Sequence, residues 1–175
     1  MHGPSRSGRG LSRRSADPTG AGLMRPSLFE FAGGEPAFLA LATAHHERCL
    51  ADPELNHPFS HPDQHPQHVQ RLAAYWAQAL GGPPAYTQAS GGDQSGVLLM
   101  HAHNGDMGDL GERFVRCFDQ AADDAGLPED PEFRAALHDY MCWAVDDVLS
   151  YSPHDAVVPT GAPLPRWGWD GLQTT

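Results

Sequence analysis

Positive charge is scarce in this sequence, and lysine is missing altogether. Of its 175 residues, 11 are basic, all of them arginine, and 22 are acidic, which gives a formal net charge of −11. Five arginines lie in the first 25 residues beside a single acidic residue, so the other 150 residues carry 6 arginines against 21 acidic residues, a net of −15. Nucleic acids and anionic membrane surfaces are recognised by clustered basic side chains. The body of the protein lacks that footprint, which argues against both as partners.

Cysteine is also rare, and long apolar runs are missing. The three cysteines, Cys49, Cys117 and Cys142, are widely spaced, and no C-x-x-C pair is present. We therefore expect neither a disulfide framework nor a cysteine-based zinc site, and reduced thiols indicate a cytoplasmic protein. No apolar run reaches the roughly 18 residues of a membrane-spanning helix. No apolar segment follows the basic N-terminus, as a secretory signal would require.

No segment shows the period-two alternation of a half-buried strand. Apolar residues recur instead at helical spacing in four stretches, within 36–50, 65–80, 110–121 and 131–148. Asp109 and Glu112 have the spacing of a capping box, and Asp130 is a typical residue before a helix. The Gly- and Pro-rich residues 81–96 are expected to form a loop, and a short apolar run follows it. The sequence predicts an all-α body of about four main helices with shorter pieces.

Composition divides the chain into three parts. Residues 1–26 are rich in Gly, Ser, Arg and Pro, and they have too few large apolar side chains to order themselves. We expect them to form a disordered extension, residues 27–153 to form the helical domain, and residues 154–175 to form a Pro-, Gly- and Trp-containing tail. The aromatic pair in that tail, Trp167 and Trp169, would either pack against the domain or serve a partner.

Histidine is the residue in excess. Its 11 copies equal the arginines, and eight of them fall between residues 45 and 103. Histidine is the commonest metal ligand, but no H-E-x-x-H motif marks a compact zinc site. A haem needs only one axial histidine and a large apolar pocket, and His101 at the end of an apolar run could provide that histidine. Composition leaves open a haem, no metal, or a non-haem site made from several of His57, His61, His65 and His68.

Several short motifs in a fixed order resemble one known family. They are Gly-Gly-Glu-Pro-x-Phe, Leu-Ala-Asp-Pro-Glu-Leu, Gly-Gly-Pro-x-x-Tyr-Thr and Met-His-Ala, then residues 109–118, His138-Asp139-Tyr140 and Ser150-Tyr151-Ser152-Pro153. Together they resemble a truncated haemoglobin of group II over residues 27–153. The resemblance implies the truncated globin fold, a two-over-two helical sandwich around a haem.

The resemblance also implies roles for individual residues. It makes His101 the proximal ligand of the haem iron. Phe59 falls where globins pack an aromatic ring on the haem, and Leu72 falls at a haem-contacting position of the distal helix. Arg71 matches an arginine that in the family reaches a haem propionate. Tyr86 matches a loop tyrosine to which we assign no role.

The sequence departs from the family pattern on the distal side. His46 stands where these proteins usually have a ligand-donating tyrosine, and Phe114 stands where they usually have a tryptophan. His68 occupies a position that is often small, after a one-residue insertion. His46 and His68 are thus expected either to donate a hydrogen bond to a ligand at the iron or to bind the iron directly.

The remaining histidines have plainer expectations. If the insertion lies elsewhere, His65 or Gln67 takes the distal place of His68. His45 falls where the family has a phenylalanine and is expected in the core. His61, His65 and His103 are expected to be solvated.

The function expected from this reading is that of a haem-binding globin. It would carry haem b and bind O₂, NO or CO, or transport oxygen, as a monomer or homodimer. The resemblance is compatible with peroxidase-like or nitric oxide dioxygenase activity, which would need a redox partner because the chain has no flavin or nicotinamide fingerprint. Two alternatives are a haem-free helical sensor or interaction domain and a non-haem histidine metal-binding protein.

Overall fold

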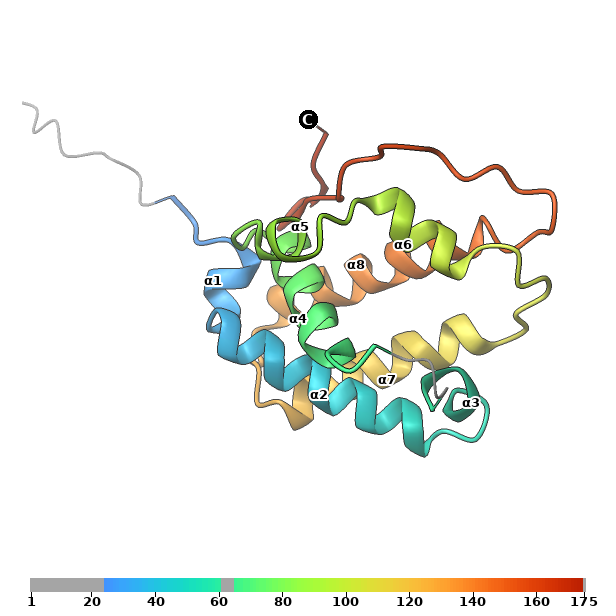
Figure 1. Cartoon of the computed structure of the whole chain (residues 1–175). Helices are drawn as coiled ribbons and strands as arrows, with labels where there is room; N and C mark the ends of the chain where they lie inside the picture. Colours follow the sequence, from blue (N-terminus) through green and yellow to red (C-terminus); the bar gives the residue numbers. More distant parts are fainter. Residues whose placement is uncertain (1–23, 61–64, 175) are drawn as a thin grey trace, which may run out of the picture.

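The computed structural model describes residues 24–60 and 65–174, and it confirms the predicted all-α class (Figure 1). The helices in this part are α1 (Leu28–Ala32), α2 (Glu35–Ala51), α3 (Asn56–Phe59), α4 (His68–Ala79), α5 (Ala85–Ser90), α6 (Gln94–His101), α7 (Leu110–Asp124) and α8 (Pro131–Leu149). A two-residue antiparallel pair, β1 (Trp167–Gly168) and β2 (Gly171–Leu172), follows them. The expected extension falls largely on residues 1–23, outside the described residues.

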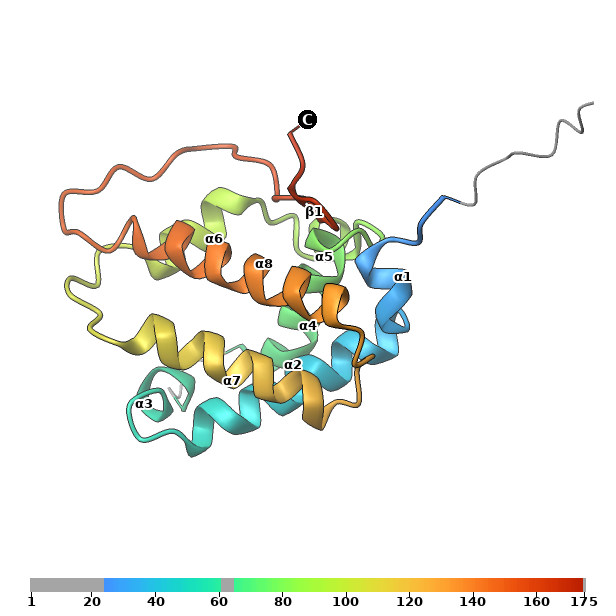
Figure 2. The same ribbon diagram turned by 180° about the vertical axis from the view of Figure 1, so that it is seen from behind.

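The four longest helices form two crossing pairs. α2 packs on both α4 and α7, and α7 packs on α8. Figures 1 and 2, seen from opposite sides, show α2 and α4 on one side and α7 and α8 on the other. Gly111 permits the approach of the last pair, because a Cβ there would lie 2.8 Å from Leu149 Cδ1 and 2.9 Å from Val145 Cγ1. The result is a two-over-two helical sandwich.

The core fills the space between these pairs with the residues that the apolar spacing marked. Phe38 and Leu41 of α2, Phe118 of α7, and Phe133 and Tyr140 of α8 are each at most 1% exposed. Burying each of these large side chains contributes about 1.5–3 kcal/mol. The predicted start of α8 is confirmed, since the Asp130 carboxylate accepts a hydrogen bond from the Phe133 N–H at 2.9 Å.

Three local expectations were wrong. Residues 81–96 are not one loop, because they contain α5 and the start of α6, where Asp93 accepts from the Gly96 N–H. His65 precedes α4 instead of lying on it. Asp109 forms no capping box, because its carboxylate instead binds the Arg113 guanidinium at 2.8 Å. In each case the local structure depends on a hydrogen bond or ion pair that residue spacing does not reveal.

The C-terminal segment returns to the helices after α8. Trp167 is 9% exposed and packs on Tyr140 and Trp143. Trp169 packs on Phe31 and donates its indole N–H to the Pro26 carbonyl at 2.7 Å. The aromatic pair therefore packs against its own domain. Within the described part of the chain, no helix combines the length and the apolar character needed to cross a membrane.

Candidate functional site

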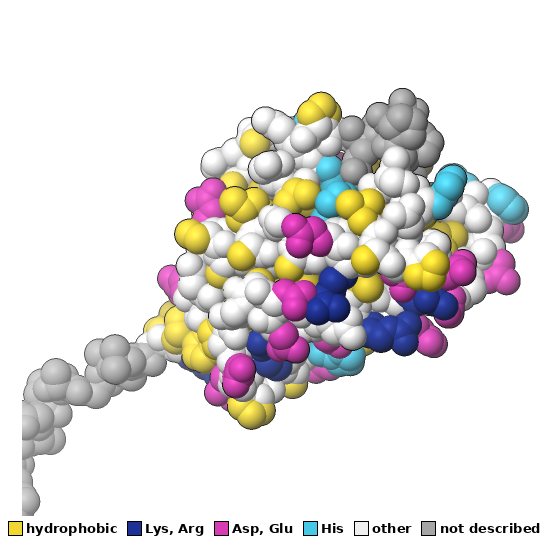
Figure 3. Space-filling model, turned by 90° about the horizontal axis from the view of Figure 1, so that it is seen from below, with side chains coloured by type: hydrophobic (Ala, Val, Ile, Leu, Met, Phe, Trp, Pro, Cys, Tyr) yellow, Lys and Arg dark blue, Asp and Glu magenta, His cyan; other side chains and the backbone are white. Residues whose placement is uncertain are grey.

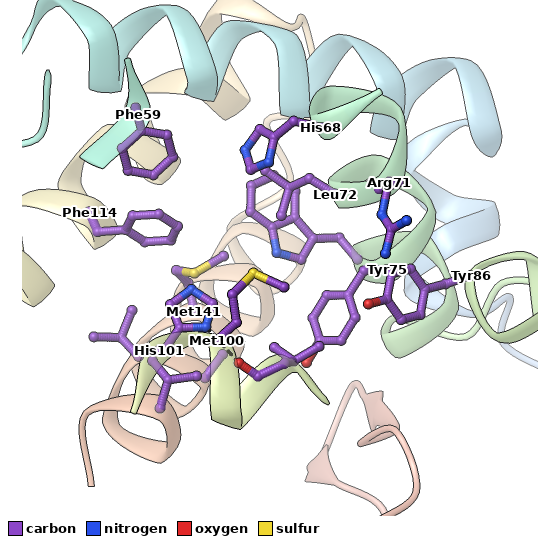
Figure 4. A pocket seen from close by; sticks show the side chains of 15 residues that line it. Phe59, His68, Arg71, Leu72, Tyr75, Tyr86, Met100, His101, Phe114 and Met141 are labelled. Carbon is purple, nitrogen blue, oxygen red and sulfur yellow. Dashed lines mark hydrogen bonds between the residues drawn. The ribbon is translucent and has the colours of Figure 1, made fainter. Parts of the chain in front are cut away.

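A cavity of about 190 Å³ opens between α4, α6, α7 and α8 (Figure 4). Its volume is more than ten times the roughly 15 Å³ that one water needs. Six of the seven site residues expected from the sequence line it: Phe59, His68, Arg71, Leu72, His101 and Phe114. The other lining residues are Tyr75, Trp76, Tyr86, Val97, Met100, Met141, Ala144, Val145 and Val148. The walls are thus mainly apolar and aromatic, with histidine and arginine as the polar exceptions.

His101 is the last residue of α6, and its ring faces the cavity (Figure 4). Its Nδ1 lies 2.8 Å from the Val97 carbonyl oxygen, one turn earlier in the same helix. A carbonyl can only accept a hydrogen bond, so Nδ1 carries a proton, and in the neutral ring the lone pair is then on Nε2. Histidines that bind a metal usually donate their second ring N–H in this way, which fixes the ring and raises its basicity. His101 therefore has the arrangement of a metal ligand.

His68 begins α4 on another side of the same cavity, away from His101 in Figure 4. Its Nε2 is buried and has no hydrogen-bond partner among the described residues. Burial, together with the charge of neighbouring His46, lowers the pKa of His68. The ring is therefore neutral at physiological pH. A buried polar atom without a partner costs about 1–3 kcal/mol, so this nitrogen is available to a group inside the cavity.

His46 lies behind His68 and is not part of the cavity wall. The two ring centroids are 5.5 Å apart, and that of Phe59 is 6.0 Å from His46. The Nδ1 of His46 is also buried, and no partner for it is found in the part of the chain that the structure describes. Burial lowers the pKa of His46 as well. The structure thus brings His46 next to the site and leaves contact with the cavity to His68.

His45, the neighbour of His46, lies in the core. It is fully buried, its ring centroid lies 4.3 Å from that of Phe114, and its Nε2 is 3.4 Å from the Phe114 carbonyl oxygen. Burial lowers the pKa of His45 to about 4. The expectation of a core histidine is confirmed. Its contact with Phe114 also connects the core to the wall of the cavity.

A buried hydrogen-bonded chain supports one side of the cavity. The Tyr75 hydroxyl donates to Gln94 Oε1 at 2.8 Å, and Gln94 Nε2 donates to the Asp147 carboxylate at 3.1 Å. Burial raises the pKa of Tyr75, so its hydroxyl stays protonated. The sequence did not reveal these hydrogen bonds, because Gln94 lies in a segment that was predicted to be a loop. The only signal was the position of Tyr75 beside Trp76 on an apolar helix.

The polar edge of the cavity is formed by Arg71 and Tyr86, which lie on the same side in Figure 4. Arg71 is partly exposed. A guanidinium at the mouth of an apolar cavity suits a ligand that has carboxylates at one end and a hydrophobic body.

The alternative of a non-haem metal site gains no support from the described residues. Among them, no group of three or more His, Cys, Asp or Glu side chains is placed to hold a metal ion. Of the four histidines considered for such a site, His61 lies outside the described residues. His65 is exposed and accepts a hydrogen bond from the Gln67 N–H.

Arginine and acidic side chains lie close together on the surface. On the face shown in Figure 3, arginine side chains lie beside acidic ones. Arg48 binds Asp124 and Gln120, and Arg113 binds Asp52 at 3.2 Å. The charge of these two arginines is thus compensated by neighbouring acidic side chains, which leaves them less available to a polyanion.

Comparison with known proteins identifies the family and the fold. The model of the family described as bacterial-like globin matches residues 27–146. Solved structures similar to the chain include the haemoglobin of the thermophilic phototrophic bacterium Chloroflexus aurantiacus, with 23% identity, a TM-score of 0.60, and coverage of 71% of this chain and 98% of that one. The thermostable haemoglobin of the actinobacterium Thermobifida fusca has 26% identity and a TM-score of 0.58, with 77% and 99% covered.

A third similar structure is the group II truncated haemoglobin of Bacillus anthracis. It has 21% identity and a TM-score of 0.59, with 71% of this chain and 91% of that one covered. The comparison with curated proteins gave no match. The likeness to these structures confirms the predicted helical sandwich.

Proposed function

The chain belongs to the bacterial-like globin family, with the fold of the group II truncated haemoglobins, and from this premise we propose that its cavity binds haem b and a diatomic gas. The proposal depends above all on His101. Its Nδ1–H is held by the Val97 carbonyl, and its Nε2 lone pair is left for iron at the cavity. No other histidine that lines the cavity has its second nitrogen fixed by a backbone carbonyl in the described residues.

The residues around the cavity fit a haem in shape and charge. Phe59, Leu72 and Phe114 offer the apolar surface against which a flat macrocycle packs. Arg71 at the edge would pair with the haem propionates. When bound, the haem iron supplies an open coordination position that takes O₂, NO or CO. The apolar walls exclude water around that position and strengthen the hydrogen bonds made there.

His68 would be the polar group on the side away from His101. As a neutral imidazole with a buried, unpartnered Nε2, it would donate a hydrogen bond to the gas held in the cavity. In this arrangement its other nitrogen carries no proton. His46, at a centroid distance of 5.5 Å, would limit the directions in which the His68 ring turns. In this proposal His68 would supply the hydrogen bond that tyrosine and tryptophan usually donate in the family, with His46 behind it.

A titration of the purified protein with haemin tests the proposal. We expect a sharp Soret band that saturates at about one haem per chain, because one cavity holds one axial histidine. Absorption and iron analysis give the stoichiometry. A chain that stays colourless would contradict the proposal. Broad absorption that grows without saturation would contradict it too, since it indicates adsorption to the surface.

Replacement of His68 by leucine should speed the release of O₂ from the haem-loaded protein by roughly 10- to 100-fold. A hydrogen bond to a partly charged acceptor contributes about 1.5–3 kcal/mol, and leucine fills the space without donating. Stopped-flow dissociation measures the effect. CO, which accepts hydrogen bonds poorly, should leave at a nearly unchanged rate. The His46→Phe variant should show a smaller change, since His46 does not line the cavity.

The same variants test the alternative in which a histidine binds the iron directly. In that case the unliganded ferrous protein is six-coordinate, and His68→Leu converts it to a five-coordinate spectrum. A five-coordinate parent instead supports His68 as a donor. Equal O₂ release from the parent and His68→Leu would contradict the donor role.

A further inference from the structure

Among the four helices α4, α6, α7 and α8 that enclose the cavity, α6, which carries His101, has the fewest buried residues. In α6 only Gln94 and Leu98 are buried, while Leu99 is 61% exposed. Met100, which is 70% exposed, lines the cavity. One buried leucine is little apolar burial to fix an eight-residue helix. Segments with few buried apolar contacts open most easily. Besides Leu98 and the hydrogen bonds of the Gln94 side chain, contacts with segments outside the core help to hold α6 in place.

The C-terminal segment after α8 contacts both ends of α6. At the N-terminal end, the Gln94 N–H donates to the Ala162 carbonyl at 3.0 Å, and the Ala162 N–H donates to Ser95 Oγ at 2.9 Å. Beyond the C-terminal end, the His103 N–H donates to the Tyr151 carbonyl at 3.0 Å. Figure 2 shows this segment running along α6 on its way to β1. We call residues 151–162 the strap.

His103 is the main contact at the C-terminal end of α6. Its ring Nε2 donates to the Ala156 carbonyl at 2.9 Å, and its backbone N–H donates to the Tyr151 carbonyl. Its φ of 62° is the only positive value at a non-glycine residue in the described part of the chain. This backbone conformation is disfavoured for a residue with a Cβ and persists only where surrounding contacts impose it. The strap provides those contacts, two residues after His101.

Both ends of the strap are anchored in the folded body. It continues directly from α8, and the Gly105 N–H donates to Ser152 at 2.8 Å just beyond α6. After residue 162 the chain reaches the tryptophan pair. Trp167 packs on α8, and Trp169 packs on α1 with the Arg25 guanidinium 3.3 Å from its ring centroid. A segment fixed at both ends can hold a weakly embedded helix between them.

We propose that the strap positions His101 by clamping both ends of α6, with His103 and Ser95 as positioning residues. The proposal rests on the proposed function, in which His101 binds the haem iron. It goes beyond the family match, which ends at residue 146. Loosening the strap should let α6 move, so that the His101 ring would approach the haem iron in a range of orientations instead of one.

The first test measures amide hydrogen exchange of the full-length chain as purified. His103→Asn keeps a residue that tolerates positive φ but is too short to reach Ala156, and Ser95→Ala removes the acceptor of the Ala162 N–H. Each loses one hydrogen bond of about 0.5–1.5 kcal/mol, so we expect exchange in α6 to rise roughly 2- to 12-fold. Exchange in α2 and α8 should stay as in the parent.

Two control variants separate the strap from a general loss of stability. His103→Gln places an amide donor near the position of Nε2 and should restore most of the protection of α6. His138→Asn removes a surface contact to Asp119 on the far side of α8 and should leave α6 unchanged. Unchanged α6 exchange in both His103→Asn and Ser95→Ala would overturn the proposal. A similar rise in every helix would overturn it as well, because the contacts would then serve overall stability.

The second test reads the bond to His101 in the haem-loaded protein. Resonance Raman spectra of the ferrous form report the iron–histidine stretching band. We expect this band to broaden or shift in His103→Asn and Ser95→Ala and to return in His103→Gln. Faster α6 exchange with an unchanged band would show that the strap holds the helix without positioning His101. If the chain binds no haem, the proposed function fails, while the exchange measurement still decides whether the strap clamps α6.

Discussion

Replacing His101 by glycine should weaken haem binding by more than about 100-fold. Loss of a partner that merely orients a metal ligand already costs 10- to 100-fold in affinity, and this change removes the ligand itself. Haem would then be held only by the apolar walls and Arg71. Haemin titration of the variant, followed by competition with a high-affinity apo-globin, measures the difference. The exposed end of α6 makes this a mild change for the fold, since His101 is not buried.

Added imidazole makes the same experiment specific. Glycine leaves a space of the size of the lost ring, so millimolar imidazole should restore a histidine-type spectrum in His101→Gly. The matched control is His57→Gly on α3, which changes another exposed histidine outside the cavity wall. It should bind haem like the parent. If His101→Gly keeps the parent spectrum and affinity, His101 is not the iron ligand.

In the His45→Phe variant, the loss of stability on acidification should be about 2–3 kcal/mol smaller than in the parent. The folded protein lowers the pKa of His45 to about 4, whereas an unfolded chain has a histidine pKa of about 6.5. The unfolded state therefore takes up the proton first. The stability is fully present above pH 6.5, and it falls as the pH drops from 6.5 to 4. Phenylalanine takes up no proton in either state, so this part of the loss disappears.

Urea unfolding of parent and variant at pH 7 and pH 4.5 measures this effect. The free energy of unfolding of the parent should fall further between the two pH values than that of His45→Phe. Leu41→Met serves as the control, because Leu41 is also fully buried on α2 and the exchange usually costs less than about 1.5 kcal/mol. That cost should be equal at both pH values. Identical pH dependence in the parent and His45→Phe would show that His45 is not held neutral by burial.

Local sequence signals predicted the helices well and the short segments poorly. Apolar spacing marked the inward faces of α2, α7 and α8, since a helix of several turns must bury one side. Residues 81–96 were misjudged because glycine and proline indicate where helices end, whereas α5 and α6 depend on contacts with α4 and with the strap. The Asp109 carboxylate had two nearby partners, the helix N-terminus and Arg113, and spacing cannot rank them.

The site divides in the same way. Family motifs pointed to His101, Phe59, Leu72 and Arg71, and the fold brings all four to one cavity. The hydrogen bonds from Tyr75 through Gln94 to Asp147 could not be anticipated, because they join residues 19 and 53 positions apart on three different helices. The same holds for the contact of His103 with Ala156, between segments whose separation carries no periodic signal.

The sequence alone determined the all-α class, the acidic body and a histidine at the end of an apolar run, because each depends on composition or on residues a few positions apart. Tertiary structure decided which of the histidines on α2 and α4 lines the cavity opposite His101. His45, His46 and His68 are similar in chemistry and close in sequence, yet packing places the first in the core, the second behind the wall and the third in the wall. It also folded the C-terminal segment along α6. Burial and hydrogen-bond partners set the protonation of each ring, and these arise only when distant segments meet.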